Sequence, residues 1–198
     1  MTASAHPFDL SGGHPALDLV NTLDERPFPE PVENLAEYSD LVRFAELTGL
    51  IGAGQAKALR KHAAKDRTRV VARARQLREH VYETLTALRQ RKKVPPRTLE
   101  AISAAIQEAR AARVLTAPKN RSLAGYDWLS PHAAEVPLHA CALAIEELLT
   151  DADRDRIRKC GAEDCEVYFI DRSKGRRRHW CSMSNCGNRE KQRRWRAG

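Results

Sequence analysis

Four cysteines near the end of the chain are the residues best suited by type and spacing to do chemistry. They form two C-x4-C pairs, Cys160 with Cys165 in CGAEDC and Cys181 with Cys186 in CSMSNC, and fifteen residues separate the pairs. Four thiolates complete a tetrahedral zinc site and leave no coordination position for a catalytic water. The spacing therefore predicts a structural metal centre, with redox dithiols or inert buried cysteines as the alternatives.

Two other residues bear on this metal centre. His179 could replace one cysteine as a ligand, although four thiols already fill the coordination shell. Cys141 stands apart within an apolar helical stretch, and we expect it to be a core residue. The predicted ligands are thus the four paired cysteines, and the predicted cofactor is a structural Zn²⁺.

The segment between the cysteine pairs has to bring the four sulfurs together. EVYFI at 166–170 is typical of a strand, DRSKG at 171–175 of a turn, and RRRHW at 176–180 of a returning strand. The second pair then begins a helix, whose N-terminal dipole favours thiolates. This order predicts a treble-clef-like module, and because it has only about 40 residues, zinc has to supply part of its folding free energy.

The formal charge of the chain is concentrated in the same segment. Residues 154–198 contain 14 Lys or Arg and 6 Asp or Glu, which accounts for the whole net charge of +8 and leaves the remainder neutral. Such asymmetry predicts a neutral domain that carries a basic module for a polyanionic partner. A basic tail that serves only solubility is the alternative.

Eight basic residues of this segment are the predicted nucleic-acid contacts, because arginine suits bidentate contacts to phosphate or guanine. Five of them follow Cys186 on the expected helix. Arg189, Arg193 and Arg196 share one face of this helix, and Lys191 and Arg194 flank that face. Three more lie on the expected returning strand: Arg176, Arg177 and Arg178.

Structural roles compete with nucleic-acid binding at several of these positions. Arg189 could brace the metal site instead of contacting phosphate, and Asn188 suits a helix cap better than base readout. Four aromatic residues could stack on bases or form the core of the module: Tyr168, Phe169, Trp180 and Trp195. Charge does not distinguish DNA from RNA, and a short module buries too little groove to select a site by itself, so a homodimer would supply a second half-site.

The first 152 residues predict a mainly helical domain with a small β-hairpin, so the whole chain belongs to the α+β class. Apolar periodicity predicts helices after Pro15, before Gly49, and over 54–64, 66–93, 98–112 and 130–149. The β-rich runs at 113–117 and 125–129 predict the hairpin. A polar stretch around residue 152 links this domain to the cysteine module, which gives predicted domains of 1–152 and 153–198.

The segment HPALDLVNTLDE places polar groups on an otherwise apolar helix. His14 and Asp18 are four residues apart and share a face, as do Asp18 and Asn21. These residues could line a small-molecule site that controls the basic module, or they could cap the helix and bond within the core. An enzyme with His14 as base and Asp18 as its orienting partner is a weaker alternative, because no nucleophile or phosphate loop accompanies them.

The motifs resemble a known pair of bacterial domains. The pattern C-x4-C-x3-F-I-D-x-S-x4-R-x-W-C-S-M-x2-C-G-N-R-x-K resembles the CGNR zinc finger, with the cysteines on its metal positions. GGHPALDLVNTLDERP followed by LAEYSDLVRFAELTGLI resembles the ABATE domain that precedes this finger in stress-induced transcriptional regulators. The resemblance implies a DNA-binding regulator that is not an enzyme. An RNA-binding or protein-binding scaffold is the alternative.

Other classes of protein are disfavoured by the composition. A hydrophobic content of 42% with 30% charged residues describes an ordinary globular chain. Apolar runs such as CALAI are far shorter than the ~20 residues that a bilayer requires. The first residues, MTASAHPFDL, have neither a basic start nor an apolar core, so we expect no secretion signal and a cytoplasmic location.

Overall fold

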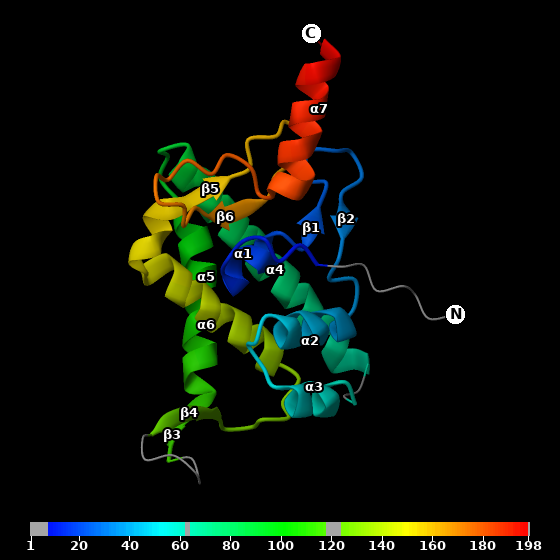
Figure 1. Ribbon diagram of the computed structural model, residues 1–198. Coiled ribbons are helices and arrows are strands. Elements are labelled where there is room, and N and C mark those ends of the chain that lie inside the picture. The colour runs from blue at the N-terminus through cyan, green and yellow to red at the C-terminus, as the bar shows by residue number, and fades with distance from the viewer. Residues whose placement is uncertain (1–7, 62–63, 118–123, 198) are drawn as a thin grey trace, which may run out of the picture. The chain divides into compact units, whose positions relative to one another are not determined.

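The computed structural model describes residues 8–61, 64–117 and 124–197 (Figure 1). Contacts divide the chain into two compact units, one formed by Ala36–Glu147 and the other by Met1–Leu35 together with Leu148–Gly198. The described residues are mainly helical, and they contain three two-stranded antiparallel sheets. The α+β prediction is confirmed.

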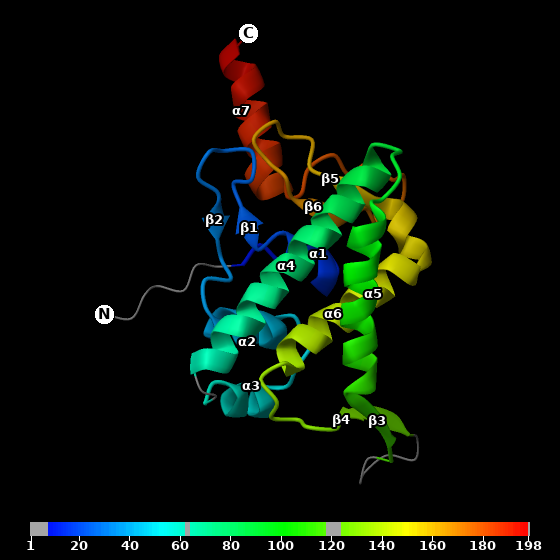
Figure 2. The ribbon, with the colours of Figure 1, turned by 180° about the vertical axis from the view of Figure 1, so that it is seen from behind.

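The unit formed by 36–147 consists of packed helices and one hairpin. Helices α4 and α5 pack along each other, and α2 packs against α3 and α4 (Figure 2). The Tyr38 hydroxyl donates a hydrogen bond to the Ala134 carbonyl and thereby ties the start of α2 to the segment before α6. The helices are α2 (Tyr38–Leu47), α3 (Ala53–Leu59), α4 (Ala64–Arg89), α5 (Pro96–Ala111) and α6 (Val136–Thr150). The last residues of α6, from Leu148, belong to the other unit.

The apolar stripe predicted for the long helix is buried along most of α4. Its members Val70, Ala74, Leu77, Val81 and Leu85 are at most 4% exposed. The apolar periodicity of the sequence also predicts that Leu88 and Leu99 face inward, but both are about half exposed. This prediction is wrong because Leu88 lies in the last turn of α4 and Leu99 in the first turn of α5, on either side of the loop that joins them.

The predicted hairpin is present as β3 (Arg113–Thr116) and β4 (Gly125–Trp128), with Arg113 opposite Trp128 and Thr116 opposite Gly125. The connection expected between the strands falls on 118–123, outside the described residues. Pro137 is the second residue of α6, so it marks the start of that helix instead of a kink.

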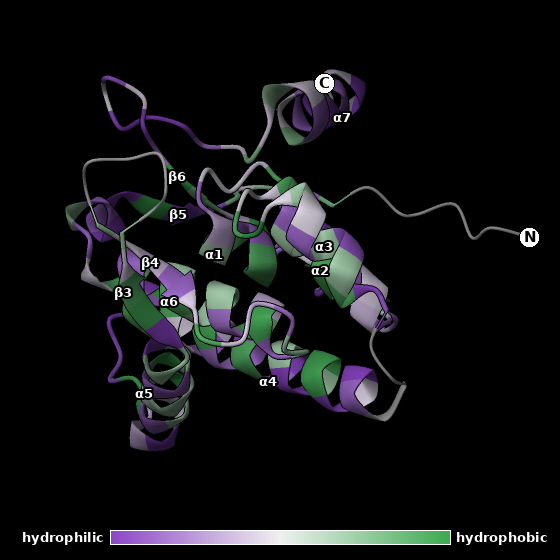
Figure 3. Cartoon of the chain, turned by 90° about the horizontal axis from the view of Figure 1, so that it is seen from below, coloured by the Kyte–Doolittle hydropathy of each residue, from purple (hydrophilic) through white to green (hydrophobic). Residues whose placement is uncertain are grey.

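The other unit joins the two ends of the chain. Its first segment contains α1 (Pro15–Val20), β1 (Leu23–Asp24) and β2 (Val32–Glu33). Its second segment contains a 3-10 turn (Ala152–Arg156), β5 (Ile157–Lys159), β6 (Tyr168–Ile170), a π-helical turn (Met183–Gly187) and α7 (Asn188–Ala197). Strongly hydrophilic residues cover most of α7 (Figure 3).

The hairpin next to the cysteines differs from the predicted one. Strand β6 pairs with β5, which precedes Cys160, with Arg158 opposite Phe169. The strand predicted at 176–180 is wrong, because side chains accept the hydrogen bonds that a ladder would need. The Arg177 N–H donates to Ser173 Oγ, and the Arg178 N–H donates to Asp171 Oδ2, each at 3.0 Å.

Candidate metal centre and nucleic-acid interface

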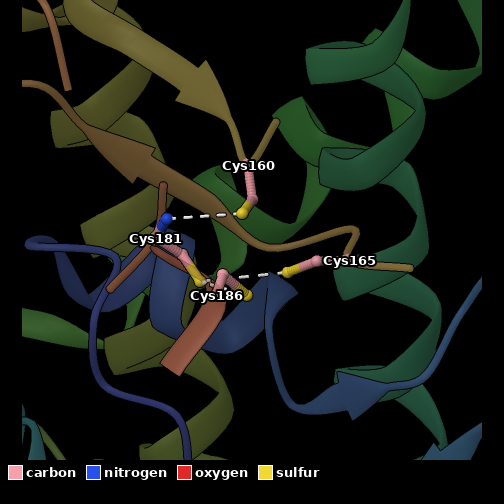
Figure 4. A group of neighbouring side chains, drawn as sticks. All are labelled: Cys160, Cys165, Cys181 and Cys186. Carbon is pink, nitrogen blue, oxygen red and sulfur yellow. Dashed lines mark hydrogen bonds between the residues drawn. The ribbon is translucent and has the colours of Figure 1, made fainter. Parts of the chain in front are cut away.

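The four paired cysteines converge on one point. Cys160 follows β5, Cys165 precedes β6, Cys181 ends the long loop and Cys186 lies in the π-helical turn before α7. Their sulfurs all lie within 4.8 Å of one another, with Cys165 Sγ 3.9 Å from Cys181 Sγ and Cys181 Sγ 3.4 Å from Cys186 Sγ (Figure 4). Tetrahedral zinc with Zn–S bonds of about 2.3 Å requires sulfurs about 3.8 Å apart. The cluster fits that ion.

The electrostatics of the cluster also require a cation. Hydrogen bonds from the Cys165 and Cys181 thiols lower the pKa of Cys160 below its ordinary value, while their interaction with Cys160 raises the pKa of both donors, that of Cys165 to about 12. The four sulfurs therefore hold one negative charge readily and resist further ones. A divalent ion removes this resistance by stabilising all four thiolates. Zinc is structural here, since the cysteines complete its shell.

Packing around the sulfurs fixes their positions. The cysteines are 2–9% exposed and form one cluster with Ala162 and Phe169, against which Val167 and Trp180 pack. The Cys181 N–H points at Cys160 Sγ at 3.4 Å. The ring of His179 lies over Gly161, where an added Cβ would come within 2.4 Å of Nε2. Within the described residues the cluster consists of cysteines only, so His179 does not replace a ligand.

The aromatic residues of the module divide between core and surface. Tyr168 and Phe169 are buried on β6, and Trp180 is half-buried beside the cysteines. These three residues have the core role that was one of the two alternatives. Trp195 differs from them, because 85% of its surface is exposed on α7.

Asp164, between the first two cysteines, engages two of the predicted nucleic-acid contacts. Arg189 Nη2 lies 2.7 Å from Asp164 Oδ1, and Arg193 Nη2 lies 2.7 Å from Asp164 Oδ2. Arg189 also donates to Cys186 Sγ at 3.2 Å. Partial burial opposes ionisation of Asp164, but the hydrogen bonds from Arg193 and Arg189 lower its pKa overall. The two arginines therefore brace the metal centre through one carboxylate and one ligand.

Arg178 is a second brace. Its guanidinium lies 4.2 Å above the ring of Phe169 and donates to the carbonyls of Trp180 and Cys181. A carbonyl that precedes a metal ligand is thereby held in place. Arg178 thus ties the loop to the core of the module.

The other five predicted contacts remain at the surface. All are exposed, and none forms an ion pair within the described part of the chain. They are Arg176 and Arg177 in the loop, and Lys191, Arg194 and Arg196 on α7.

Each of the three residues predicted to bind a ligand has a bonded role in the structure. His14 is the N-cap of α1, where Nδ1 accepts a hydrogen bond from the Ala16 N–H at 3.2 Å. Asp18 is 6% exposed and its Oδ1 accepts from the Gly12 N–H at 2.9 Å; burial, with a contribution from Asp9, raises its pKa to about 7. Ligand binding by these residues stays a prediction.

Asn21 connects the start of the chain to the metal module. Its Nδ2 donates to the Tyr168 carbonyl and its Oδ1 accepts from the Tyr168 N–H, both at 2.9 Å. The Gly12 carbonyl accepts from the Ile170 N–H at 2.9 Å. One edge of β6 pairs with β5, so these contacts cover the opposite edge, which would otherwise be unpaired.

A cleft of about 380 Å³ lies beside the metal centre within this unit. One wall comes from the first segment of the chain, including Asp24 and Arg26, and the other from the module, including Asp164, Cys186 and Arg189. The Nε atom of Arg189 is buried without a hydrogen-bond acceptor within the described structure. The cleft therefore has a polar donor that a ligand could use.

Comparison with known families agrees with this geometry. Residues 13–152 match the ABATE family, described as "Putative stress-induced transcription regulator", and residues 156–197 match the CGNR zinc finger. The ABATE match covers more than half of the chain. The protein belongs to this family. No curated protein matches the chain.

The two family matches account for the four-cysteine metal centre and indicate the class of protein. The ABATE–CGNR protein belongs to a family of regulators, not of enzymes. None of its described helices combines the length and apolar character needed to cross a bilayer. The division into domains of 1–152 and 153–198 stays a prediction.

Sequence reasoning missed the roles of Asp164 and Asn21. Asp164 could have been suspected, because an acidic residue inside a CGAEDC loop is well placed to pair with arginines near the metal. Asn21 gave no comparable signal, since its partner Tyr168 is 147 residues away.

Proposed function

We propose that the ABATE–CGNR protein is a cytoplasmic transcriptional regulator that binds DNA through its zinc finger. One observation carries the proposal: α7 begins at the metal centre and presents Lys191, Arg194 and Arg196, which form no ion pair within the described ranges, while Arg176 and Arg177 are exposed on the loop. Cations without internal partners can neutralise phosphates and release counterions. A reducing cytoplasm would keep the cysteines available for zinc.

The proposal includes DNA, not RNA or an acidic protein, as the partner. Five unpaired cations on a helix and an adjacent loop suit the regularly spaced phosphates of a duplex. Because one finger covers little DNA, the proposal also includes a homodimer that supplies a second half-site.

Control by a small molecule or stress signal is the second part of the proposal. The cleft beside the metal centre supports it, because Arg189 in its wall contacts both Asp164 and Cys186. A ligand that bonds to Arg189 would compete with these contacts. Binding of such an effector should change the thermal stability of the full chain.

Electrophoretic retardation of a random-sequence DNA duplex by the full chain tests DNA binding. We expect retardation that weakens steeply as salt increases, with a log–log slope near −4 to −5 if all five cations contact phosphate. A zinc chelator should abolish it. Failure of the zinc-loaded protein to retard DNA at low salt would refute the proposed function.

A further inference from the structure

The helix that carries most of the predicted contacts has two sides with different surroundings. Arg189 and Arg193 occupy one side, four residues apart, and both contact Asp164. Arg193 also pairs with Glu190 at 2.7 Å. Phosphate contacts by these residues would compete with ion pairs that support the metal centre. The arginine stripe expected from the sequence is therefore largely engaged within the protein.

Residues on the other side of α7 form no ion pair with any residue that the structure describes. At 3.6 residues per turn, Lys191 and Trp195 lie one turn apart, roughly opposite Arg189 and Arg193, and Arg194 lies next to them. All three are exposed, and Trp195 is the most exposed large apolar residue described, at 85%. An exposed tryptophan beside two cations that lack ion pairs within the described structure is unusual for a surface that meets only water.

A groove continues this surface toward the metal centre. Gly187 identifies the side of the helix, because an added Cβ there would lie 2.8 Å from Met183 Sδ and 3.1 Å from Trp180 Cδ1. Lys191 follows Gly187 by one turn. Trp180, Met183, His179 and Arg177 line an open groove of about 720 Å³, and Met183 is 68% exposed.

We propose that the groove and the Lys191–Arg194–Trp195 side of α7, not the Arg189–Arg193 stripe, form the surface that binds duplex DNA. Lys191, Arg194 and Arg177 contact phosphates, and Trp195 and Met183 make apolar contacts with sugars and base edges. The inference rests on the proposed DNA-binding function and assigns its surface. Arg189 and Arg193 act as positioning residues that hold α7 against the metal centre.

Neighbouring arginines provide a matched test. Arg194→Gln and Arg193→Gln remove the same charge from neighbouring positions about 100° apart around the helix, one within the proposed surface and one in the stripe. In a fluorescence anisotropy titration of the zinc-loaded full chain with a random-sequence duplex, we expect Arg194→Gln to weaken binding roughly tenfold at ~0.1 M salt and to reduce the log–log salt slope by about 0.9. Lys191→Gln should do the same, and Arg193→Gln should leave the slope unchanged.

Trp195 tests the apolar part of the surface. Trp195→Ala should weaken binding about fivefold or more without changing the salt slope, and Trp195→Phe should restore part of the loss. Zinc content is measured for every variant, because a loss of metal would identify a folding defect. If Arg193→Gln loses zinc, the comparison rests on Arg194→Gln and Lys191→Gln against wild type.

The outcomes separate the inference from the function on which it rests. Equal binding by wild type, Arg194→Gln and Lys191→Gln would overturn the assigned surface and leave DNA binding intact. A lower salt slope for Arg193→Gln than for Arg194→Gln, at full zinc content, would return the site to the arginine stripe. Tighter binding of RNA or single-stranded DNA than of the duplex would refute duplex DNA as the ligand, and no binding by wild type would refute both proposals.

Discussion

Asn21→Ala tests whether the start of the chain is a structural part of the zinc module. Asn21 and Tyr168 are 3% and 2% exposed, and two hydrogen bonds of 2.9 Å join the Asn21 amide to the Tyr168 backbone. Alanine would leave one buried N–H and one buried carbonyl without partners, and each orphaned group costs about 1–3 kcal/mol. We therefore expect a destabilisation of about 2–5 kcal/mol.

Two measurements on the full chain report this loss. Denaturant unfolding should show a lower free energy of unfolding for Asn21→Ala, and a chromogenic chelator should extract zinc from the variant faster than from wild type. Asn188→Ala is the matched control, because Asn188 is exposed on the same unit and should change stability by less than about 0.5 kcal/mol. Equal unfolding and zinc release by Asn21→Ala and wild type would refute the structural role and favour a ligand-binding role for Asn21.

Three further predictions concern the same unit. Burial raises the pKa of Asp18 from 3.8 to about 7, so between these pH values the folded chain binds more protons than the unfolded chain. The free energy of unfolding of the wild type should therefore fall as pH rises from about 4 to 7, by up to about 4 kcal/mol relative to Asp18→Asn. Parallel pH profiles of the two proteins would refute this. Gly12→Ala should cost about 1–3 kcal/mol in thermal unfolding, because its Cβ would lie 2.7 Å from Asp18 Oδ1, whereas Gly54→Ala, with no atom within 4 Å, should not destabilise. Chelation of zinc from the native chain should expose four thiols to a thiol reagent while buried Cys141, with a pKa of about 12, stays unreactive; reaction of Cys141 at the same rate would contradict its place in the core.

The helical elements and the metal ligands could be predicted because their signals are local. A stripe of apolar residues at steps of three and four marked α4, and the spacing of the four cysteines marked the zinc site. Gly49 marked the end of α2 well, whereas α6 begins at Val136, next to Pro137 and six residues after the predicted start at 130.

The remaining features depend on tertiary contacts that periodicity does not record. Strand β5 is only three residues long. It pairs with β6 in place of the segment RRRHW at 176–180, which the sequence predicts as the partner strand. The sequence predicts that the arginines of α7 share one face, but it does not show that this face meets Asp164 beside the metal centre. Trp195 could have been core or surface by composition, and only the packed structure separates it from Trp180.

The hydrogen bonds from Gly12 and Asn21 to β6 also determine when the protein can finish folding during synthesis. Asn21 is synthesised 147 residues before Tyr168, which at typical elongation rates is a delay of roughly 7–30 s. During this time the apolar helix α1 has no partner strand to meet, so it is available to chaperones. A nascent chain released early would lack β6 and the zinc ligands together.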